Sequence, residues 1–392
     1  MLRLIRYFKL MTLPYFFLIF SFSAIATESK SFPKVISVGV ATTLLEFESN
    51  SSITAGDFVR RGINVALRHY DKRLQEKNIR IALKEFDYAN SDLAALEAAK
   101  RAAASDVIVV HGYDFSSHAL VAAPIHQKTG LPLLSPTATA DRLTNFGPYI
   151  HQVAFNNSYQ AKMLARYAVK NLGVKRCLVV AAKDCAYCQD LEKSFSREFK
   201  KLGGETVKLS PILQSDQDFA PLVAEAKVKN IDAVFLPNYE VLSARIVSAF
   251  LSAGIRKPFI GGDGWTSFGE RIFKSAMAER DFKAYSIGHW HLTSLLPASQ
   301  RLVKDFQAIY KTQANDTAAL AYDTMCIILE AVLRAKTYTR ESIERELRQL
   351  KTFHGATGKI QLGTQSARSL YLLHMNKNGF SLVEDLSERY AW

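Results

Sequence analysis

Short apolar runs alternate with segments of helical periodicity along most of the chain. Residues 107–110 and 231–236 are almost entirely apolar, as strands covered on both faces usually are. Between such runs, apolar side chains recur at helical spacing, for example at Val59, Ile63 and Ala66. Strands separated by helices of this length are typical of βαβ units. The pattern therefore predicts an α/β fold built on parallel sheets.

The expected elements follow one another without a stretch that would mark a flexible linker. We expect strands at residues 34–40, 79–83, 107–110, 131–134, 177–182, 206–209, 231–236 and 259–261. We expect helices at residues 59–70, 93–104, 189–202, 219–229 and 241–253. The chain has 392 residues, which is enough for two domains. Because no repeat or low-complexity stretch separates them, we expect two lobes that share a continuous chain with several crossovers.

The N-terminus has the pattern of an export signal. The first nine residues contain three basic side chains, and an apolar segment follows at residues 10–22. Ala24 and Ala26 then form an A-x-A cleavage pattern. The sequence predicts a cleaved signal peptide over residues 1–26 and a periplasmic location. An uncleaved membrane anchor is the alternative that remains open at this point.

The net charge of +13 does not indicate a nucleic-acid partner. Beyond the N-terminus, no run of five or more basic residues occurs. Dispersed basic residues are more typical of a solvated surface than of a nucleic-acid site.

Two expected strands end in turns that are rich in hydroxyl side chains. Ser116 and Ser117 follow the third expected strand, and Thr137 and Thr139 follow the fourth. In open α/β sheets, ligands bind beyond the carboxyl ends of strands, where helix N-termini offer free N–H groups. These turns therefore predict one polar pocket floor. Helix capping by the same hydroxyls is the alternative.

A glycine-rich turn with a carboxylate follows the last expected strand. Asp263 lies between Gly262 and Gly264, and Trp265 follows directly. Glycine lets a backbone approach a ligand closely, and the carboxylate can bind an ammonium or amide group. An Asp that bonds its own backbone in a turn is the alternative.

The pair Cys185 and Cys188 forms a C-x-x-C motif around Tyr187. In an exported protein we expect a local disulfide, with free thiols as the alternative. A zinc site would need two further ligands, and no second C-x-x-C occurs in the sequence. The other two cysteines, Cys177 and Cys326, fit ordinary core positions.

The search for catalytic and cofactor motifs gives no match. G-x-S-x-G, H-E-x-x-H, a P-loop, and a G-x-G-x-x-G after the first strand are all absent from the sequence. His289 and His291 would face the same side of a strand, but a third metal ligand is missing. We therefore expect no enzymatic activity, no cofactor and no metal.

Several segments in a fixed order carry a resemblance to a known family. They are residues 111–144, the helix-like segment 159–168, the turn 261–265, and the segments 318–335 and 355–380. In these segments the chain resembles the type I periplasmic solute-binding proteins of the leucine/isoleucine/valine-binding group. Those proteins are the receptors of branched-chain amino acid ABC importers.

The resemblance implies two Rossmann-like α/β lobes with parallel sheets, joined by three hinge strands. Lobe 1 would contain residues 34–153 and 288–358, and lobe 2 would contain residues 155–286 and 359–392. The hinge strands would lie near residues 152–155, 285–289 and 358–362. A solute would bind in the cleft between the lobes and be enclosed by hinge closure.

The resemblance also implies which residues meet the solute. The positions that bind an amino-acid carboxylate in the family correspond to Ser116, Thr137 and Thr139. The ammonium group would meet the Asp263 carboxylate and the Thr137 carbonyl. The family usually has Glu where Asp263 stands, and Asp has the shorter side chain.

Further positions would surround the solute. Tyr187 and Tyr239 correspond to aromatic residues of lobe 2 that close over the ligand. Trp265, Ser117 and Asp114 are further candidates for the ligand wall. The loop 42–54 is less typical of the family, and we assign no role to it.

The function implied is an extracytoplasmic receptor of an ABC importer that binds a small amino-acid-like or amide solute. Its partner would be a membrane ABC permease, with no nucleic acid involved, and we expect a monomer. The alternative is a ligand-binding sensor of the same fold that signals to a membrane receptor.

Overall fold

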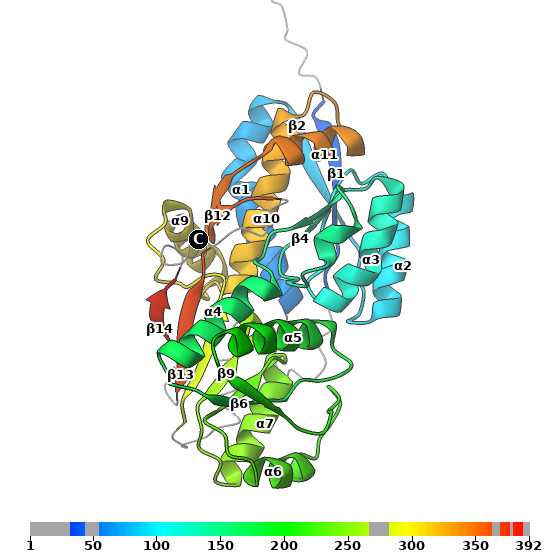
Figure 1. Ribbon diagram of the computed structural model, residues 1–392. Coiled ribbons are helices and arrows are strands. Elements are labelled where there is room, and N and C mark those ends of the chain that lie inside the picture. Colours follow the sequence, from blue (N-terminus) through cyan, green and yellow to red (C-terminus); the bar gives the residue numbers. More distant parts are fainter. Residues whose placement is uncertain (1–31, 44–54, 266–281, 363–368, 377–378, 387–392) are drawn as a thin grey trace, which may run out of the picture. The chain divides into compact units, whose positions relative to one another are not determined.

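The computed structural model describes residues 32–43, 55–265, 282–362, 369–376 and 379–386, and Figure 1 shows their helices and strands. The predicted signal peptide and residues 44–54 of the first loop lie outside the described residues. The described residues from Pro33 onward form one compact unit. Among the helices of this described part, none has the length and apolar character that a membrane span requires.

The first sheet has the strand order β2-β1-β3-β4-β5, and all its pairs are parallel. Its strands are β1 (Lys34–Val40), β2 (Ile79–Glu85), β3 (Val110–His111), β4 (Leu133–Ser135) and β5 (Ile150–Gln152). The strand expected over residues 107–110 is shorter than predicted. Regular pairing begins only at Val110, although the Ile108 N–H still donates to the Ser37 carbonyl at 3.1 Å.

Helices cover both faces of the first sheet. They are α1 (Ala55–Glu76), α2 (Asp92–Ala104), α3 (Ser116–Thr129), the 3₁₀ helix η1 (Leu143–Phe146), α9 (Pro297–Tyr310), α10 (Asp316–Arg334) and α11 (Arg340–Gln349). Leu133 packs in a cluster with α2 and α3, whereas its neighbour Leu134 packs in a cluster with α1, α9, α10 and α11. Successive strand residues point to opposite faces, so the sheet lies between these two layers. A short hairpin, β11 (Phe353–Gly355) and β12 (Gly358–Ile360), follows α11.

The second sheet has the order β14-β13-β10-β9-β8-β6-β7 in the described part of the chain. Its strands are β6 (Arg176–Val179), β7 (Glu205–Lys208), β8 (Ala233–Leu236), β9 (Phe259–Gly261), β10 (Ala284–Gly288), β13 (Tyr371–Asn376) and β14 (Gly379–Asp385). Strands β6 to β10 pair in parallel, as predicted, whereas β13 and β14 add an antiparallel edge. The helices are α4 (Asn157–Lys170), α5 (Ala186–Lys201), α6 (Ala220–Lys227), α7 (Glu240–Ser252) and the 3₁₀ helix η2 (Asp263–Trp265).

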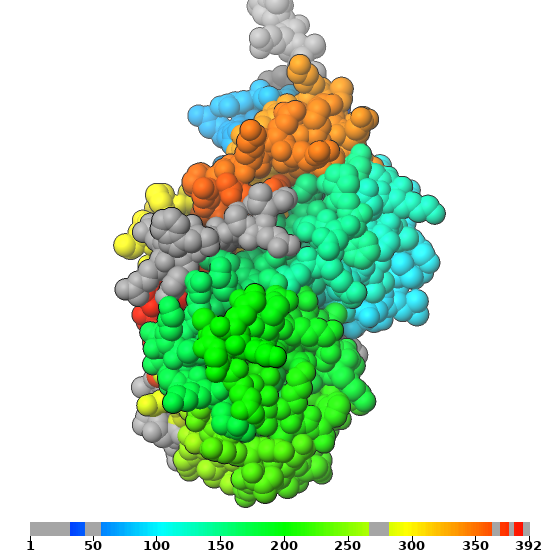
Figure 2. Space-filling view, viewed as in Figure 1, coloured from blue at the N-terminus to red at the C-terminus, as the bar shows by residue number. Residues whose placement is uncertain are grey.

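The hydrophobic cores of the two sheets draw on different parts of the chain. The core of the second sheet takes its buried residues from 155–287 and 370–386. The two clusters of the first sheet take theirs from 36–153 and 290–360. Segments of the two sheets lie directly against each other on the face shown in Figure 2, and hydrogen bonds cross between them. One joins the Asp141 N–H to Asp190 Oδ2 at 2.9 Å. The lobe boundaries given above remain a prediction.

Candidate ligand-binding site

The two hydroxyl-rich turns of the first sheet come together in space. Because β3 and β4 are neighbours in the sheet, the residues that follow them lie side by side. Ser116, the first residue of α3, accepts a hydrogen bond at its Oγ from the Thr139 N–H at 3.3 Å. The Thr137 hydroxyl donates to the Asp114 carbonyl at 2.6 Å. Ser116 and Thr139 are almost fully buried, and Ser117 is half-buried.

Asp114 is held by hydroxyl groups from the segments that follow the first two strands. Its Oδ2 accepts hydrogen bonds from the Thr42 hydroxyl at 2.7 Å and from the Tyr88 hydroxyl at 3.0 Å. The Asp114 N–H donates back to the Tyr88 oxygen at 3.2 Å. Burial, together with the Asp114 charge, raises the pKa of Tyr88 well above its usual value, so this hydroxyl stays protonated and keeps its proton to donate. The Asp114 carboxylate is therefore engaged within the first-sheet part of the protein.

Asp263 lies directly beyond β9, at the start of η2, and both of its oxygens have partners. Oδ1 accepts a hydrogen bond from Gln160 Nε2 at 2.7 Å, and Oδ2 lies 3.1 Å from His289 Nε2. The Gln160 Oε1 also accepts from the Asp263 N–H at 3.1 Å. The Asp263 side chain is only 10% exposed. The carboxylate is thus a buried anion surrounded by polar donors.

Two tyrosines of the second sheet stack beside Asp263. The rings of Tyr187 and Tyr239 are 4.9 Å apart and nearly parallel. The Tyr187 hydroxyl accepts a hydrogen bond from the Gly264 N–H at 3.1 Å. Burial, and after it the Asp263 charge, raises the pKa of both tyrosines above their usual range. The Ser116 N–H opposes this shift at Tyr239, because it donates to the Tyr239 hydroxyl.

The predicted site residues from the two sheets therefore meet. Tyr239 follows β8 and precedes α7, and its ring contacts Phe115 edge-on at 5.3 Å between ring centroids. Phe115 directly precedes α3. The carboxyl ends of β3, β4, β6, β8 and β9 thus converge on one cluster of hydroxyl, aromatic and carboxylate groups, which we call the strand-end cluster. Its members are Phe115, Ser116, Thr137, Thr139, Tyr187, Tyr239 and Asp263.

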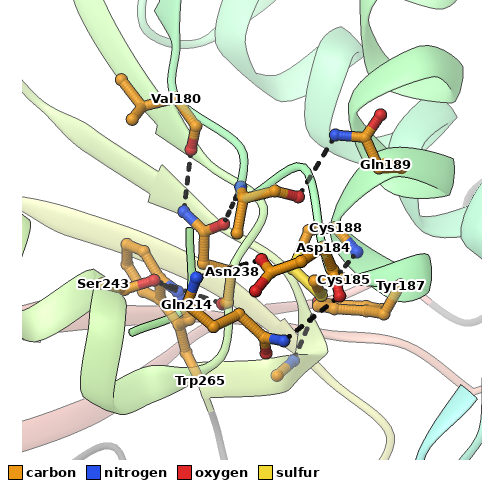
Figure 3. Close-up of a disulfide and its surroundings, with 12 residues drawn as sticks. Val180, Asp184, Cys185, Tyr187, Cys188, Gln189, Gln214, Asn238, Ser243 and Trp265 are labelled. Carbon is orange, nitrogen blue, oxygen red and sulfur yellow. Dashed lines mark hydrogen bonds between the residues drawn. A yellow bond between two sulfur atoms is a disulfide. The ribbon is translucent and has the colours of Figure 1, made fainter. Parts of the chain in front are cut away.

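Trp265 lies within the core of the second sheet. Its indole is fully buried, and Nε1 donates to the Ser243 hydroxyl at 2.8 Å, as Figure 3 shows. A Cβ atom at Gly261 would come within 2.1 Å of the indole ring, so only glycine leaves room for it. Trp265 therefore supports the turn that carries Asp263 from the core side.

Cys185 and Cys188 are joined by a disulfide at the start of α5 (Figure 3). Cys185 is the N-cap of the helix, and its sulfur accepts from the Cys188 N–H at 3.1 Å. The preceding loop is tied down by Asp184, whose Oδ1 accepts from the Gln214 N–H at 3.0 Å. Tyr187 therefore projects from a cross-linked first turn.

The expectation that His289 and His291 share a strand face is wrong. Strand β10 ends at Gly288, so both histidines lie beyond the regular pairing. His289 turns toward Asp263, whereas His291 Nδ1 lies 2.7 Å from the Thr293 hydroxyl. Across the described ranges, no group of three His, Cys, Asp or Glu side chains is arranged to hold a metal ion.

Sequence analysis did not identify Gln160 and His289. Gln160 lies on the buried face of α4, and only its contact with Asp263 distinguishes it from a core residue. For His289 the signal lies in the register of the folded sheet and not in the sequence. Strand β10 pairs with β9 in parallel, with Tyr285 opposite Ile260, so the residues after both strands must lie together.

In α/β proteins, ligands bind beyond the carboxyl ends of parallel strands, and here such ends of two sheets converge on one cluster. A model of the family described as periplasmic binding protein matches residues 36–379, and the chain belongs to this family. The family is one of binding proteins rather than enzymes, in agreement with the sequence prediction. Its name implies an extracytoplasmic location.

Curated relatives match part of the chain at low identity. The chain is 26% identical over 242 residues to the Leu/Ile/Val-binding protein of Citrobacter freundii, covering 62% of this chain and 65% of that relative. It is 25% identical over 210 residues to Leu/Ile/Val-binding protein homolog 3 of Brucella melitensis, covering 53% of this chain and 57% of the relative. The matched region is therefore less than two thirds of the length of either relative.

Solved structures agree with the fold over nearly the whole chain. The leucine binding protein LivK of Thermotoga maritima has a TM-score of 0.81 and 24% identity, covering 90% of this chain and 99% of that one. The branched-chain amino acid transporter substrate binding protein LivJ of Streptococcus pneumoniae, in complex with isoleucine, has a TM-score of 0.79 and 26% identity over the same shares. The α/β fold predicted from the sequence is confirmed.

Proposed function

We propose that the protein is the extracytoplasmic receptor of an ABC importer and binds a small amino-acid-like or amide solute at the strand-end cluster. The observation that carries this proposal is the meeting of Ser116 and Tyr239. It brings the hydroxyl-rich turns of one sheet against the tyrosines and carboxylate of the other. The LivJ structure in complex with isoleucine, at 26% identity and with nearly full coverage, supports an amino acid as the class of solute.

The two sides of the cluster suit the two ends of a zwitterion. Ser116 begins α3, so the N–H groups and partial positive charge of a helix N-terminus lie beside the Ser116 and Thr139 hydroxyls. Such a place favours a carboxylate. Asp263 supplies the opposite charge on the second sheet, and it is buried enough that water screens it little. A solute between the two would have its ends fixed by charge.

Lobe closure would complete the site. In this proposal, residues 34–153 and 288–358 form one lobe and residues 155–286 and 359–392 form the other. Three crossing strands near residues 152–155, 285–289 and 358–362 act as the hinge. Tyr187 and Tyr239 would move with the second lobe and close over the solute. The closed form would then dock on the permease.

Export and the partner belong to the same proposal. Residues 1–26 would be removed as a signal peptide, so that the receptor works in the periplasm. The relatives and structures named for transport favour a permease over the sensor alternative. Reconstitution with the permease subunits would separate the two: solute-dependent ATP hydrolysis supports the importer, and its absence with a functional permease favours the sensor.

A thermal-shift screen of the purified protein tests the solute. Amino acids, short amides, urea and small aromatic acids form the panel, because a ligand that binds only the folded state raises the melting temperature. We expect a shift with one zwitterionic or amide class and its loss in Asp263→Ala. The matched control is Asp71→Ala, an exposed aspartate on α1, which should keep the shift. Absence of any shift, with no solute released from the denatured protein, would contradict the proposal.

A further inference from the structure

His289 occupies a position that connects the Asp263 carboxylate to an aromatic ring outside the predicted ligand residues. The residue is 4% exposed, and its imidazole stacks on Phe155, with the ring centroids 3.6 Å apart and the planes inclined by 26°. Its Nε2 lies 3.1 Å from Asp263 Oδ2. An ionised carboxylate only accepts hydrogen bonds, so Nε2 carries the proton in this contact.

The other oxygen of Asp263 also accepts a hydrogen bond from a buried side chain. Gln160 Nε2 donates to Oδ1 at 2.7 Å, and the same nitrogen donates to Asn157 Oδ1 at 2.9 Å. Both Gln160 and Asn157 are fully buried. Because each carboxylate oxygen has a fixed donor, the short aspartate side chain is held in one orientation. His289 is one of the donors to this carboxylate, beside Gln160 and the Tyr187 hydroxyl, and the stack on Phe155 fixes the ring that carries it.

We propose that His289 is a positioning residue that sets the preference of the site for solutes bearing an ammonium group. It acts through Asp263 by holding the carboxylate in the orientation in which it meets a cation. This inference rests on the proposed function, since it assigns to Asp263 the ammonium end of the solute. It adds a specificity determinant outside the predicted ligand set, which contacts Asp263 from the segment that follows β10.

The physical reason is the cost of losing a donor in a buried place. A buried carboxylate oxygen that gives up a hydrogen bond is destabilised in its anionic form, which is the form that attracts an ammonium group. The end of the solute that lies at Ser116 and Thr139 does not depend on this contact. A change at His289 therefore affects solutes with an ammonium group and spares the same solutes without it.

Two variants separate the hydrogen bond from the ring stack. His289→Phe keeps a flat ring for Phe155 and removes the donor. His289→Gln loses the ring but places an amide nitrogen at about the same reach as Nε2. His291→Phe is the matched control, because that histidine bonds Thr293 and not Asp263.

The experiment measures dissociation constants by calorimetry for L-leucine, L-isoleucine, L-valine and L-phenylalanine, and for the deaminated carboxylic acid of each. We expect His289→Phe to weaken amino-acid binding about tenfold to a hundredfold, the usual effect of losing a hydrogen bond to a charged group. Binding of the deaminated acids should not change. His289→Gln should restore most of the amino-acid affinity, and His291→Phe should behave like the unaltered protein.

Each other outcome overturns the inference. Equal weakening of amino acids and deaminated acids in His289→Phe would show a purely structural role. An unchanged or tighter amino-acid affinity, or a loss in His289→Gln as large as in His289→Phe, would also contradict it. If the unaltered protein binds only uncharged amides or deaminated acids, the proposed receptor function is supported and the proposed role of His289 is contradicted. If it binds no small solute in this panel or in the thermal-shift screen, the proposed function falls as well.

Discussion

The ring of Tyr239 meets the ring of Phe115 edge-on, at 5.3 Å and nearly at right angles. Each residue directly precedes a helix, α7 for Tyr239 and α3 for Phe115, and each helix follows a strand of a different sheet. The contact therefore joins the two sheets at the carboxyl ends of their strands. The Ser116 N–H strengthens it by donating to the Tyr239 hydroxyl.

This contact predicts that Tyr239 contributes to solute affinity in two separable parts. Tyr239→Phe removes only the hydroxyl, and we expect affinity to fall about threefold to tenfold, the usual effect of one neutral hydrogen bond. Tyr239→Ala also removes the stack on Tyr187 and the edge contact with Phe115. Each aromatic contact contributes about 0.5–1.5 kcal/mol, so the total loss should be larger by at least about fivefold. Calorimetry with the solute found by thermal shift measures both.

The control for this pair is Tyr338→Phe, which alters a tyrosine that packs under Lys34, away from the strand-end cluster. It should leave the affinity unchanged. Equal affinities for Tyr239→Phe and Tyr239→Ala would contradict the separate contribution of the ring.

The strand-end cluster shows what the sequence can and cannot predict. The proximity of Ser116 and Thr139 followed from two neighbouring apolar runs that each ended in hydroxyl residues. That inference needs only the general rule that parallel strands end at the same edge. The pairing of His289 with Asp263 needs the register of β9 and β10, which is a property of the folded sheet.

The direction of side chains is the second property that the sequence did not predict. Trp265 follows Asp263 by two residues and was a candidate for the ligand wall, but its indole turns under Gly261 into the core. Likewise, the antiparallel direction of β13 and β14 follows from the path of the chain and not from composition. The local pattern of apolar and polar residues predicts the helices and strands. The direction of each side chain and the register of the strands come from packing in the folded protein.

Three buried histidines predict that the protein loses stability in mild acid. Burial lowers the pKa of His111, His118 and His126 to about 4. In the unfolded chain such imidazoles bind protons below about pH 6.5. The unfolded state therefore binds more protons between pH 6.5 and pH 4, and the free energy of unfolding falls as the pH falls through this window. Each histidine contributes at most about 3 kcal/mol to the loss.

One buried acid opposes this trend. Burial raises the pKa of the Asp323 carboxyl to about 6, which favours the folded state toward lower pH over part of the same window. The net loss should therefore be smaller than the sum for three histidines. Urea unfolding followed by circular dichroism at pH 7.5, 6 and 5 measures it. His118→Phe should reduce the slope with pH, and an identical slope would count against this account.

The disulfide between Cys185 and Cys188 predicts a combined effect on stability and binding. The variant with Cys185→Ser and Cys188→Ala keeps a capping side chain at the start of α5, since Ser is a good N-cap, and removes only the cross-link. For so short a loop we expect the free energy of unfolding to fall by about 2 kcal/mol. Because Tyr187 projects from this turn onto Tyr239 and Gly264, solute affinity should fall as well.

Reductant provides the internal control for the disulfide. The unaltered protein should approach the variant in both urea unfolding and calorimetry when a reductant is present, whereas the variant should not respond to it. Cys177→Ala, which changes a buried thiol outside the disulfide, should keep the full response to reductant. A variant that loses stability but binds solute with unchanged affinity would show that the cross-link supports the fold of α5 without positioning Tyr187. A loss in both would place Tyr187 and the disulfide in one functional unit.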